Sequence, residues 1–364
     1  MQKRYRKFCR FVILFVFGVG LYNGLVWNFF TEQLLTRKGG IYTGELARMA
    51  YLPAYAVKRE NTSDLPRRHI PLAEYHGQEI GVVTVGDSFS QGTSNGPNRF
   101  YQDYIAAVNR TNVLNLSPHY PGTANFIEAI VLLVNSGYLD KVRPRHLLLE
   151  RVERNCRKLG KPVDFSKTDS LENVERFYQA LAAREGAVSD LPPVGFLNTG
   201  NMKWLFYNLL YTISPNAFFS KVYKVDLDRP LFSGAKQKTL LFLYKGLNKF
   251  KYDSKRLDEA KVSKMNENLN RLARLLKGKG IELWFMPVVD KYSLYRPYIS
   301  DDAYPKSRSF ELMRQVDREY HLIDTLEILG AEVAKGEQDI FYRDDTHWSW
   351  KASKAIFEKV RFEP

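Results

Sequence analysis

Short runs of apolar residues alternate along the chain with longer stretches in which apolar positions recur at helical spacing. Strand-like runs lie at 79–85, 112–117, 146–150, 281–289 and 321–324. Helical patterns lie near 98–109, 123–137, 256–278 and 306–318, and a last helix follows Trp348 with Ser349 as its expected N-cap. This alternation predicts an α/β domain in three layers, α/β/α, whose parallel sheet binds ligands at the carboxyl ends of its strands.

Two segments interrupt this rhythm. Residues 157–252 contain many aromatic residues and few clear strand signals, which predicts a mainly helical insertion within a catalytic domain of residues 79–364. Residues 31–78 have mixed character, with one apolar stretch at 46–57 that suits a short helix, and with Pro66 and Pro71 interrupting regular structure. We expect this second segment to be a tether.

An uncharged apolar run, FVILFVFGVGLYNGLVWNFF at 11–30, is long enough to cross a bilayer as a helix. The leader at 1–10 carries five basic residues, which places the N-terminus in the cytoplasm and the rest of the chain outside it. A cleaved signal peptide is the first alternative, but it usually has a shorter apolar region ending in small residues. A buried core helix is the second alternative, although such helices seldom lack charge for so long.

Composition narrows the function classes only slightly. Of 364 residues, 45% are hydrophobic and 26% are charged, which is ordinary for a folded protein. The net charge is +14, and nine positive charges remain after the five of the leader are set aside. This charge suits nucleic acid, an anionic membrane surface or an acidic glycan, and the membrane anchor disfavours nucleic acid. Cys9 lies in the basic leader, so Cys9 and Cys156 are not expected to share a compartment or to form a disulfide. No spacing of Cys and His residues suggests a metal site.

Gly86-Asp87-Ser88 follows the first strand of the expected domain. A serine hydroxyl needs a neighbouring base and nearby backbone N–H donors to act as a nucleophile, and a turn between a strand and a helix supplies such donors. Ser88 is therefore the candidate nucleophile. The alternative is that Ser88 only caps the helix that follows it.

The second candidate motif is Asp344-Asp345-Thr346-His347-Trp348-Ser349, in the loop before the last helix. A carboxylate shortly before a histidine can fix its tautomer while the other ring nitrogen accepts the serine proton. His347 is therefore the candidate base.

These two motifs together resemble the SGNH (GDSL-like) hydrolase superfamily, and GDSFS with DTHWS resembles its alginate O-acetyltransferase-like, membrane-anchored group. The resemblance covers roughly 79–361 without the insertion. It implies Ser88 as nucleophile, His347 as base and Asp345 as orienting acid, although the wider superfamily's spacing would select Asp344. No metal or other cofactor is implied.

The resemblance also implies binding residues outside the triad. Gly122 matches the glycine after the second strand and would join Ser88 in an oxyanion hole, unless it is a plain turn glycine. LLLERVERN stands where the superfamily has a G-x-N-D motif, so the usual asparagine donor is missing. Arg154, in a V-E-R segment similar to that of the acetyltransferase group, would bind an oxyanion or a sugar carboxylate, or would be ion-paired. Lys291, in PVVDKYSLY, would lie near the site.

The function that these expectations imply is a serine O-acyltransferase, with acetyl as the expected group, that acts on an exported or cell-envelope polysaccharide. The basic charge of the chain suits an anionic polysaccharide. A multispanning membrane acyltransferase would then supply the acetyl group from the cytoplasmic side. A carbohydrate acetyl esterase with the same triad is one rival. A non-catalytic glycan-binding or assembly subunit is another, and it predicts that Ser88 and His347 lie too far apart for a hydrogen bond.

Overall fold

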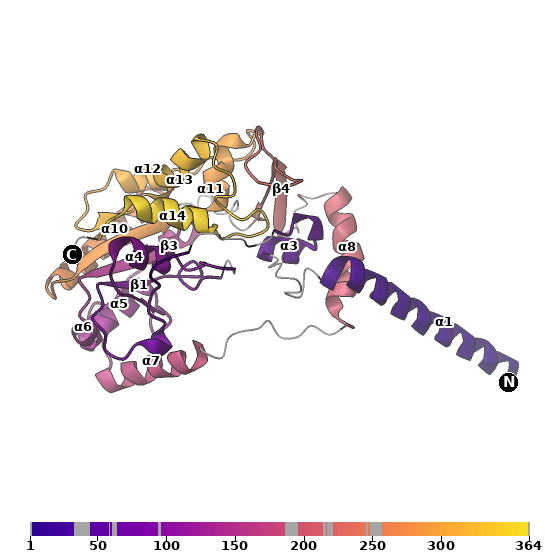
Figure 1. The fold of residues 1–364 in the computed structure, drawn as a ribbon, viewed down its shortest axis with the longest axis horizontal. Helices are drawn as coiled ribbons and strands as arrows, with labels where there is room; N and C mark the ends of the chain where they lie inside the picture. Colours follow the sequence, from indigo (N-terminus) through magenta and orange to yellow (C-terminus); the bar gives the residue numbers. More distant parts are fainter. Residues whose placement is uncertain are drawn as a thin grey trace.

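The computed structural model describes residues 2–32, 44–57, 59, 64–93, 96–185, 196–213, 216, 221–244, 247 and 257–362. Figure 1 shows a body built around one sheet and a long N-terminal helix that projects away from it. A smaller group of elements lies between the two.

The sheet has five parallel strands in the order β2-β1-β3-β6-β7. The strands are β1 (Val82–Val85), β2 (Val113–Leu116), β3 (His146–Val152), β6 (Glu282–Val288) and β7 (His321–Leu322). The predicted α/β class with a parallel sheet is therefore confirmed. From β1 the chain first moves outward to β2 and then returns to β3 on the other side, so the order reverses between β1 and β3. Ligand sites of such sheets lie at the carboxyl ends of the strands at this reversal.

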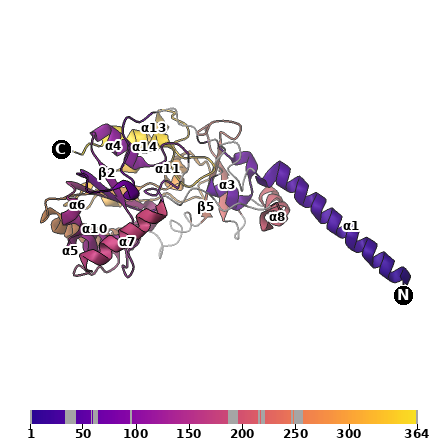
Figure 2. The ribbon, with the colours of Figure 1, turned by 60° about the horizontal axis from the view of Figure 1, so that its bottom comes forward.

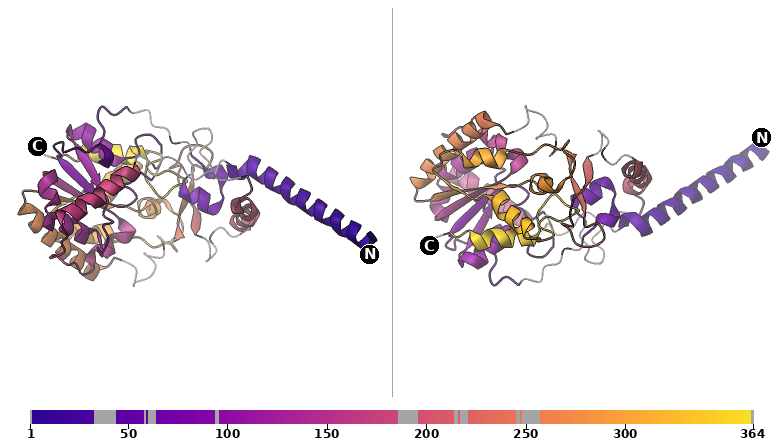
Figure 3. Two further views of the ribbon diagram at one scale, coloured as in Figure 1. Left: turned by 90° about the horizontal axis from the view of Figure 1, so that it is seen from below. Right: turned by 90° about the horizontal axis from the view of Figure 1, so that it is seen from above.

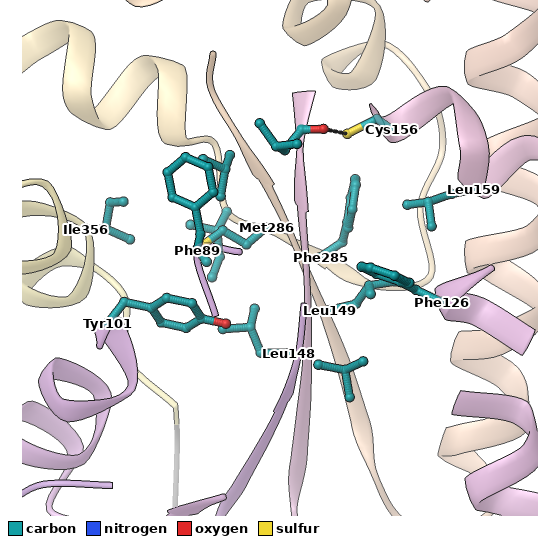
Figure 4. Close-up of a cluster of buried hydrophobic side chains, with 14 of the residues drawn as sticks. Phe89, Tyr101, Phe126, Leu148, Leu149, Cys156, Leu159, Phe285, Met286 and Ile356 are labelled. Atoms are coloured by element: carbon teal, nitrogen blue, oxygen red, sulfur yellow. Dashed lines mark hydrogen bonds between the residues drawn. The ribbon is translucent and has the colours of Figure 1, made fainter. Parts of the chain in front are cut away.

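Helices cover both faces of the sheet. Figure 4 shows Tyr101 and Ile356 on one side of the strands, and Phe126 and Leu159 on the other. The first side carries α4 (Tyr101–Asn109), α13 (Thr325–Ala334) and α14 (Trp350–Lys359), and the second carries α5 (Phe126–Asn135) and α10 (Glu259–Lys277). Ser349 caps α14 as predicted, since its side chain accepts a hydrogen bond from the Lys351 N–H. Cys156 is buried in the core.

The remaining elements are short. They are η1 (Trp27–Thr31), η3 (Pro53–Tyr55), η4 (Leu72–Glu74), α6 (Tyr138–Val142), η5 (Glu153–Gly160), α11 (Lys291–Tyr295), η6 (Arg296–Tyr298) and α12 (Ser309–Arg314).

In the described part of the segment at 157–252, the long helices are α7 (Leu171–Glu185) and α8 (Thr199–Ile213). It also contains a two-stranded antiparallel sheet, β4 (Val222–Asp226) with β5 (Thr239–Leu243), which the sequence pattern did not predict. These strands are short, and no tight-turn sequence joins them. They pack against α3 (Glu45–Ala50), between the main sheet and the N-terminal helix.

The segment expected to be a tether is in its described parts a piece of the folded body. Leu46, Ala47 and Ala50 of α3 are fully buried, and they pack with Tyr211 of α8 and Leu241 of β5. Further along, a parallel bridge pairs Ile70 with Leu114 of β2. The chain therefore packs against the catalytic body before it enters β1.

The N-terminal helix α1 (Gln2–Val26) continues through the π-helical turn η1. It is long and apolar enough to span a membrane, and most of its hydrophobic side chains are exposed. Figures 1 and 2 show it extending well beyond the rest of the molecule. This geometry is consistent with a single-pass anchor.

Candidate active site

Ser88 lies directly after β1, at the reversal of strand order. The turn that carries it is possible because residue 86 is glycine. A Cβ on Gly86 would overlap the Ser90 hydroxyl and a Glu150 carboxyl oxygen, and would lie 2.8 Å from the Glu150 Cβ. The close packing of this turn against β3 therefore requires a residue without a side chain.

Glu150 holds the turn in place from β3. Its Oε2 accepts hydrogen bonds from the Asp87 N–H at 2.8 Å and from the Ser90 hydroxyl at 2.9 Å. Burial, followed by the charge of Asp87, raises the pKa of Glu150 well above its usual range. Asp87 in turn accepts a hydrogen bond from the Val152 N–H at 3.2 Å, so three hydrogen bonds link the turn to β3.

His347 reaches Ser88 from the loop between α13 and α14. Its Nε2 lies 2.8 Å from the Ser88 Oγ, and its Nδ1 lies 2.7 Å from the Asp345 Oδ1. With the proton on Nδ1 donated to Asp345, Nε2 is free to accept the serine proton. The three side chains thus form the hydrogen-bonded chain that activation of a serine hydroxyl requires.

The environment of Asp345 keeps this carboxylate ionised. Burial opposes its ionisation, but the hydrogen bond and charge of His347, followed by the guanidinium of Arg59, lower its pKa below the usual range. A charged carboxylate at this position favours the imidazolium that forms when His347 takes a proton.

Asp344, the other candidate acid, points away from the histidine. Its Oδ1 accepts from the Arg59 guanidinium at 2.7 Å, and its Oδ2 accepts from the N–H groups of Gly44 and Val57 at 2.8 and 3.0 Å. Burial raises the pKa of Asp344, while Arg59 opposes the shift. By geometry, Asp345 is the acid that orients His347. Asp344 instead links the loop that carries both acids and His347, here called the triad loop, to Gly44, Val57 and Arg59.

Arg59 connects the two acids, and its sequence position gives no sign of this. Arg59 is 3% exposed. Besides its bond to Asp344, its guanidinium donates to the Asp345 Oδ2 at 3.3 Å. The Glu45 N–H donates to the same oxygen at 3.4 Å. Sequence reasoning missed these residues because they stand almost 300 positions before the acids and belong to no local motif.

Lys291 lies behind the triad loop. Its ammonium group donates to the backbone carbonyls of Tyr342, Arg343 and Asp345 at 2.9, 2.7 and 3.0 Å. Burial lowers its pKa to about 7 against the opposing charges of Asp344 and Asp345. Since it is 3% exposed and all three of its N–H groups are used, its geometry suits support of the loop.

Arg154 and Gly122 lie at the same edge of the sheet without joining the triad. Arg154 is paired with Asp290 through its guanidinium, and its backbone N–H donates to the same carboxylate at 3.0 Å. This is the ion-paired alternative of the sequence analysis. Gly122 has φ of +75° in an exposed turn after β2. Among the described residues, neither its N–H nor that of Ser88 donates a hydrogen bond.

Thr93 is a further residue that sequence reasoning missed. Its hydroxyl lies 2.8 Å from both the Ser88 carbonyl and the His347 Nε2. When Nε2 carries a proton, the Thr93 oxygen can accept it as a hydrogen bond in place of the Ser88 oxygen.

One group of side chains offers the atoms that a metal would need. Ligand atoms of Glu45, Asp345 and His347 lie within 4.8 Å of one another. In the present arrangement Asp345 and His347 bond each other, and Thr346 bonds Glu45. These bonds engage one carboxylate oxygen of Glu45, one of Asp345 and the Nδ1 of His347.

Comparison with known families adds to this geometry. Residues 242–360 match the family model described as SGNH hydrolase-like domain, acetyltransferase AlgX. This part of the chain is similar to an SGNH hydrolase-like domain. The resemblance to the alginate O-acetyltransferase-like group is thus confirmed. The matched part of the SGNH hydrolase-like domain contains Lys291, Asp345 and His347, whereas Ser88 and Gly122 precede it. No curated protein sequence matches the chain.

Proposed function

We propose that this protein is a membrane-anchored serine O-acyltransferase that moves an acyl group, most simply acetyl, to a hydroxyl of an exported or cell-envelope polysaccharide. The observation that carries the proposal is the hydrogen-bonded chain from Ser88 through His347 to Asp345, at the ligand-binding edge of the sheet. The match to an acetyltransferase family model supports acetyl as the transferred group.

The first half of the reaction acylates the serine. The Ser88 Oγ attacks the carbonyl carbon of the donor ester while its proton passes to the His347 Nε2. The N–H groups of Ser88 and Gly122 stabilise the negative oxygen of the tetrahedral intermediate. The bond to the leaving alcohol then breaks, the leaving oxygen takes the proton from His347, and an acyl-serine ester remains.

The second half transfers the acyl group. A sugar hydroxyl gives its proton to the His347 Nε2 and attacks the acyl carbon. The intermediate collapses, the Ser88 Oγ leaves and regains the proton, and the acetylated sugar departs. Water in place of the sugar gives hydrolysis, so the esterase rival differs only in the acceptor.

The location follows from the anchor. We propose that α1 crosses the cytoplasmic membrane with its basic N-terminus in the cytoplasm and with the catalytic body outside it. A multispanning membrane acyltransferase would then have to carry the acetyl group across the membrane to this protein, because acetyl-CoA is a cytoplasmic metabolite. The basic body suits an anionic glycan as acceptor.

The rival of a non-catalytic subunit requires Ser88 and His347 to be separated, and the 2.8 Å contact between them argues against it. The decisive assay uses the detergent-solubilised full chain with p-nitrophenyl acetate. We expect Ser88→Ala and His347→Ala to lose kcat by at least about 10³-fold. Exposed Ser166→Ala and His76→Ala are matched controls that should keep the wild-type rate.

Candidate glycans added to the same assay distinguish transfer from hydrolysis. Acetylated glycan, detected by mass spectrometry and lost in Ser88→Ala, supports the transferase. Acetate release that no glycan diverts supports the esterase. Equal rates in wild type and both triad variants contradict serine catalysis altogether.

A further inference from the structure

Helix α8 exposes its apolar side chains. Met202, Leu205, Phe206, Leu209 and Ile213 are between 55% and 73% exposed. Their spacing of three and four residues places them on a single stripe of the helix. In a helix on the surface of a soluble protein, such a stripe normally faces the core. In α8 the apolar stripe faces away from the body of the protein instead.

The opposite face of α8 explains why the helix keeps this orientation. Tyr211 is 3% exposed and packs with the buried residues of α3 and β5, and Tyr207 stacks on Tyr51 with ring centroids 5.0 Å apart. Asn201 is fully buried. Because aromatic and polar side chains attach α8 to the body, the apolar stripe is left on the outside.

Helix α8 is joined to the end of the spanning helix. The Tyr22 hydroxyl donates to the Asn201 carbonyl at 3.1 Å, and the Asn201 side chain donates to the Asn23 oxygen at 2.8 Å. Phe30 and Trp204 stack with ring centroids 4.2 Å apart. Figures 1 and 3 show α8 running across the end of α1 and not along it. A helix in this position lies along the surface of a membrane that α1 crosses.

We propose that α8 is an interfacial membrane helix that inserts its exposed stripe into the boundary between the lipid headgroups and the acyl chains. Several observations favour lipid over a protein partner. The stripe continues the apolar surface of α1, and Lys203 is the only charged residue of the helix. Trp27, Trp204 and Tyr22 gather at the junction, and such aromatic residues prefer the membrane interface.

This second membrane contact would fix the position of the triad relative to the bilayer. The inner face of α8 packs on α3, and the N–H groups of Gly44 and Glu45 at the start of α3 bond the acids of the triad loop. A donor delivered at the membrane surface would then meet Ser88 at a constant height. The inference rests on the anchor part of the proposed function and not on its chemistry.

The test uses the full chain with Cys9→Ser and with the buried Cys156 retained, one copy in each phosphatidylcholine and phosphatidylglycerol nanodisc. Spin labels are placed singly at Leu205→Cys and Leu209→Cys. Val16→Cys in α1 is the lipid control, and Lys335→Cys, at the exposed end of α13, is the water control. Power saturation then compares the accessibility of each label to oxygen and to a water-soluble nickel chelate.

We expect both α8 labels to favour oxygen over nickel, at a depth of about 5–10 Å that is shallower than that of the label at 16. Nickel accessibility equal to that at 335 would overturn the inference, and so would low accessibility to both reagents, which indicates a protein contact. If the label at 16 also shows the nickel accessibility of a residue in water, the proposal that α1 spans the membrane is wrong.

Discussion

Asparagine substitutions at the two neighbouring acids should separate catalysis from stability. In Asp345→Asn, the amide nitrogen must face either His347 or the donors of Arg59 and Glu45. The second orientation sets donors against donors in a buried place, which is costly. The first requires the His347 Nδ1 to accept a hydrogen bond, which moves the ring proton to Nε2, where it blocks transfer from Ser88.

The size of each effect follows from these contacts. A wrong tautomer of this kind lowers kcat by about 10⁴-fold in serine proteases, or about 5 kcal/mol of transition-state stabilisation. Asp344→Asn leaves the histidine untouched. It sets an amide nitrogen against the N–H groups of Gly44 and Val57 or against Arg59, so it should lower the free energy of unfolding by about 3–5 kcal/mol.

The assay pairs p-nitrophenyl acetate turnover with urea unfolding of the full chain in detergent, at a temperature where every variant is folded. Fully exposed Asp302→Asn is the matched control and should change neither quantity. A large loss of kcat in Asp344→Asn with normal kcat in Asp345→Asn would refute the assignment of the orienting acid. Equal loss of stability in both would refute the separation of roles.

Three further predictions concern the groups around the triad. Gly86→Ala should prevent correct folding of the nucleophile turn, because the added methyl group overlaps side chains of β3 and the turn. Gly330→Ala, with open space around it inside α13, should leave the circular dichroism spectrum unchanged and raise thermal stability slightly, because alanine is more favourable than glycine in a helix by about 0.5–1 kcal/mol. Lys291 has a folded-state pKa of about 7, below its unfolded value, so the unfolded chain binds the extra proton above that pH. Stability should therefore rise by up to about 1.4 kcal/mol per pH unit between about pH 7 and pH 10 through this group, and Lys291→Met should lose that slope in urea titrations; parallel slopes would contradict the argument. Arg59→Met should cost about 3–5 kcal/mol of stability, because it leaves two buried carboxylates without their cation. Arg68→Met should cost under about 1 kcal/mol, because the Arg68 side chain is largely exposed and its partner Asp103 keeps the hydrogen bonds of His69. Similar losses in the two variants would show that burial of Arg59 has no special effect.

The sequence determined those features that depend on residues close together in the chain. The apolar runs that became β1, β3 and β6 and the amphipathic pattern of α10 depend on the local period of buried positions, and Ser349 caps α14 through a contact two residues away. Ser88 and His347 could also be chosen, because each stands in a short motif whose chemistry is local.

The tertiary structure decided the contacts between segments that are distant from each other in the sequence. Arg59 is one basic residue among several before β1, and only folding brings it to acids almost 300 residues away. Asp344 and Asp345 are equivalent by composition, and the direction of each carboxylate in the folded loop gives them different partners. The exposed face of α8 is likewise set by what its other face packs against. Periodicity predicts which side of an element is apolar, but the neighbours that cover or leave that side depend on the closure of the whole chain.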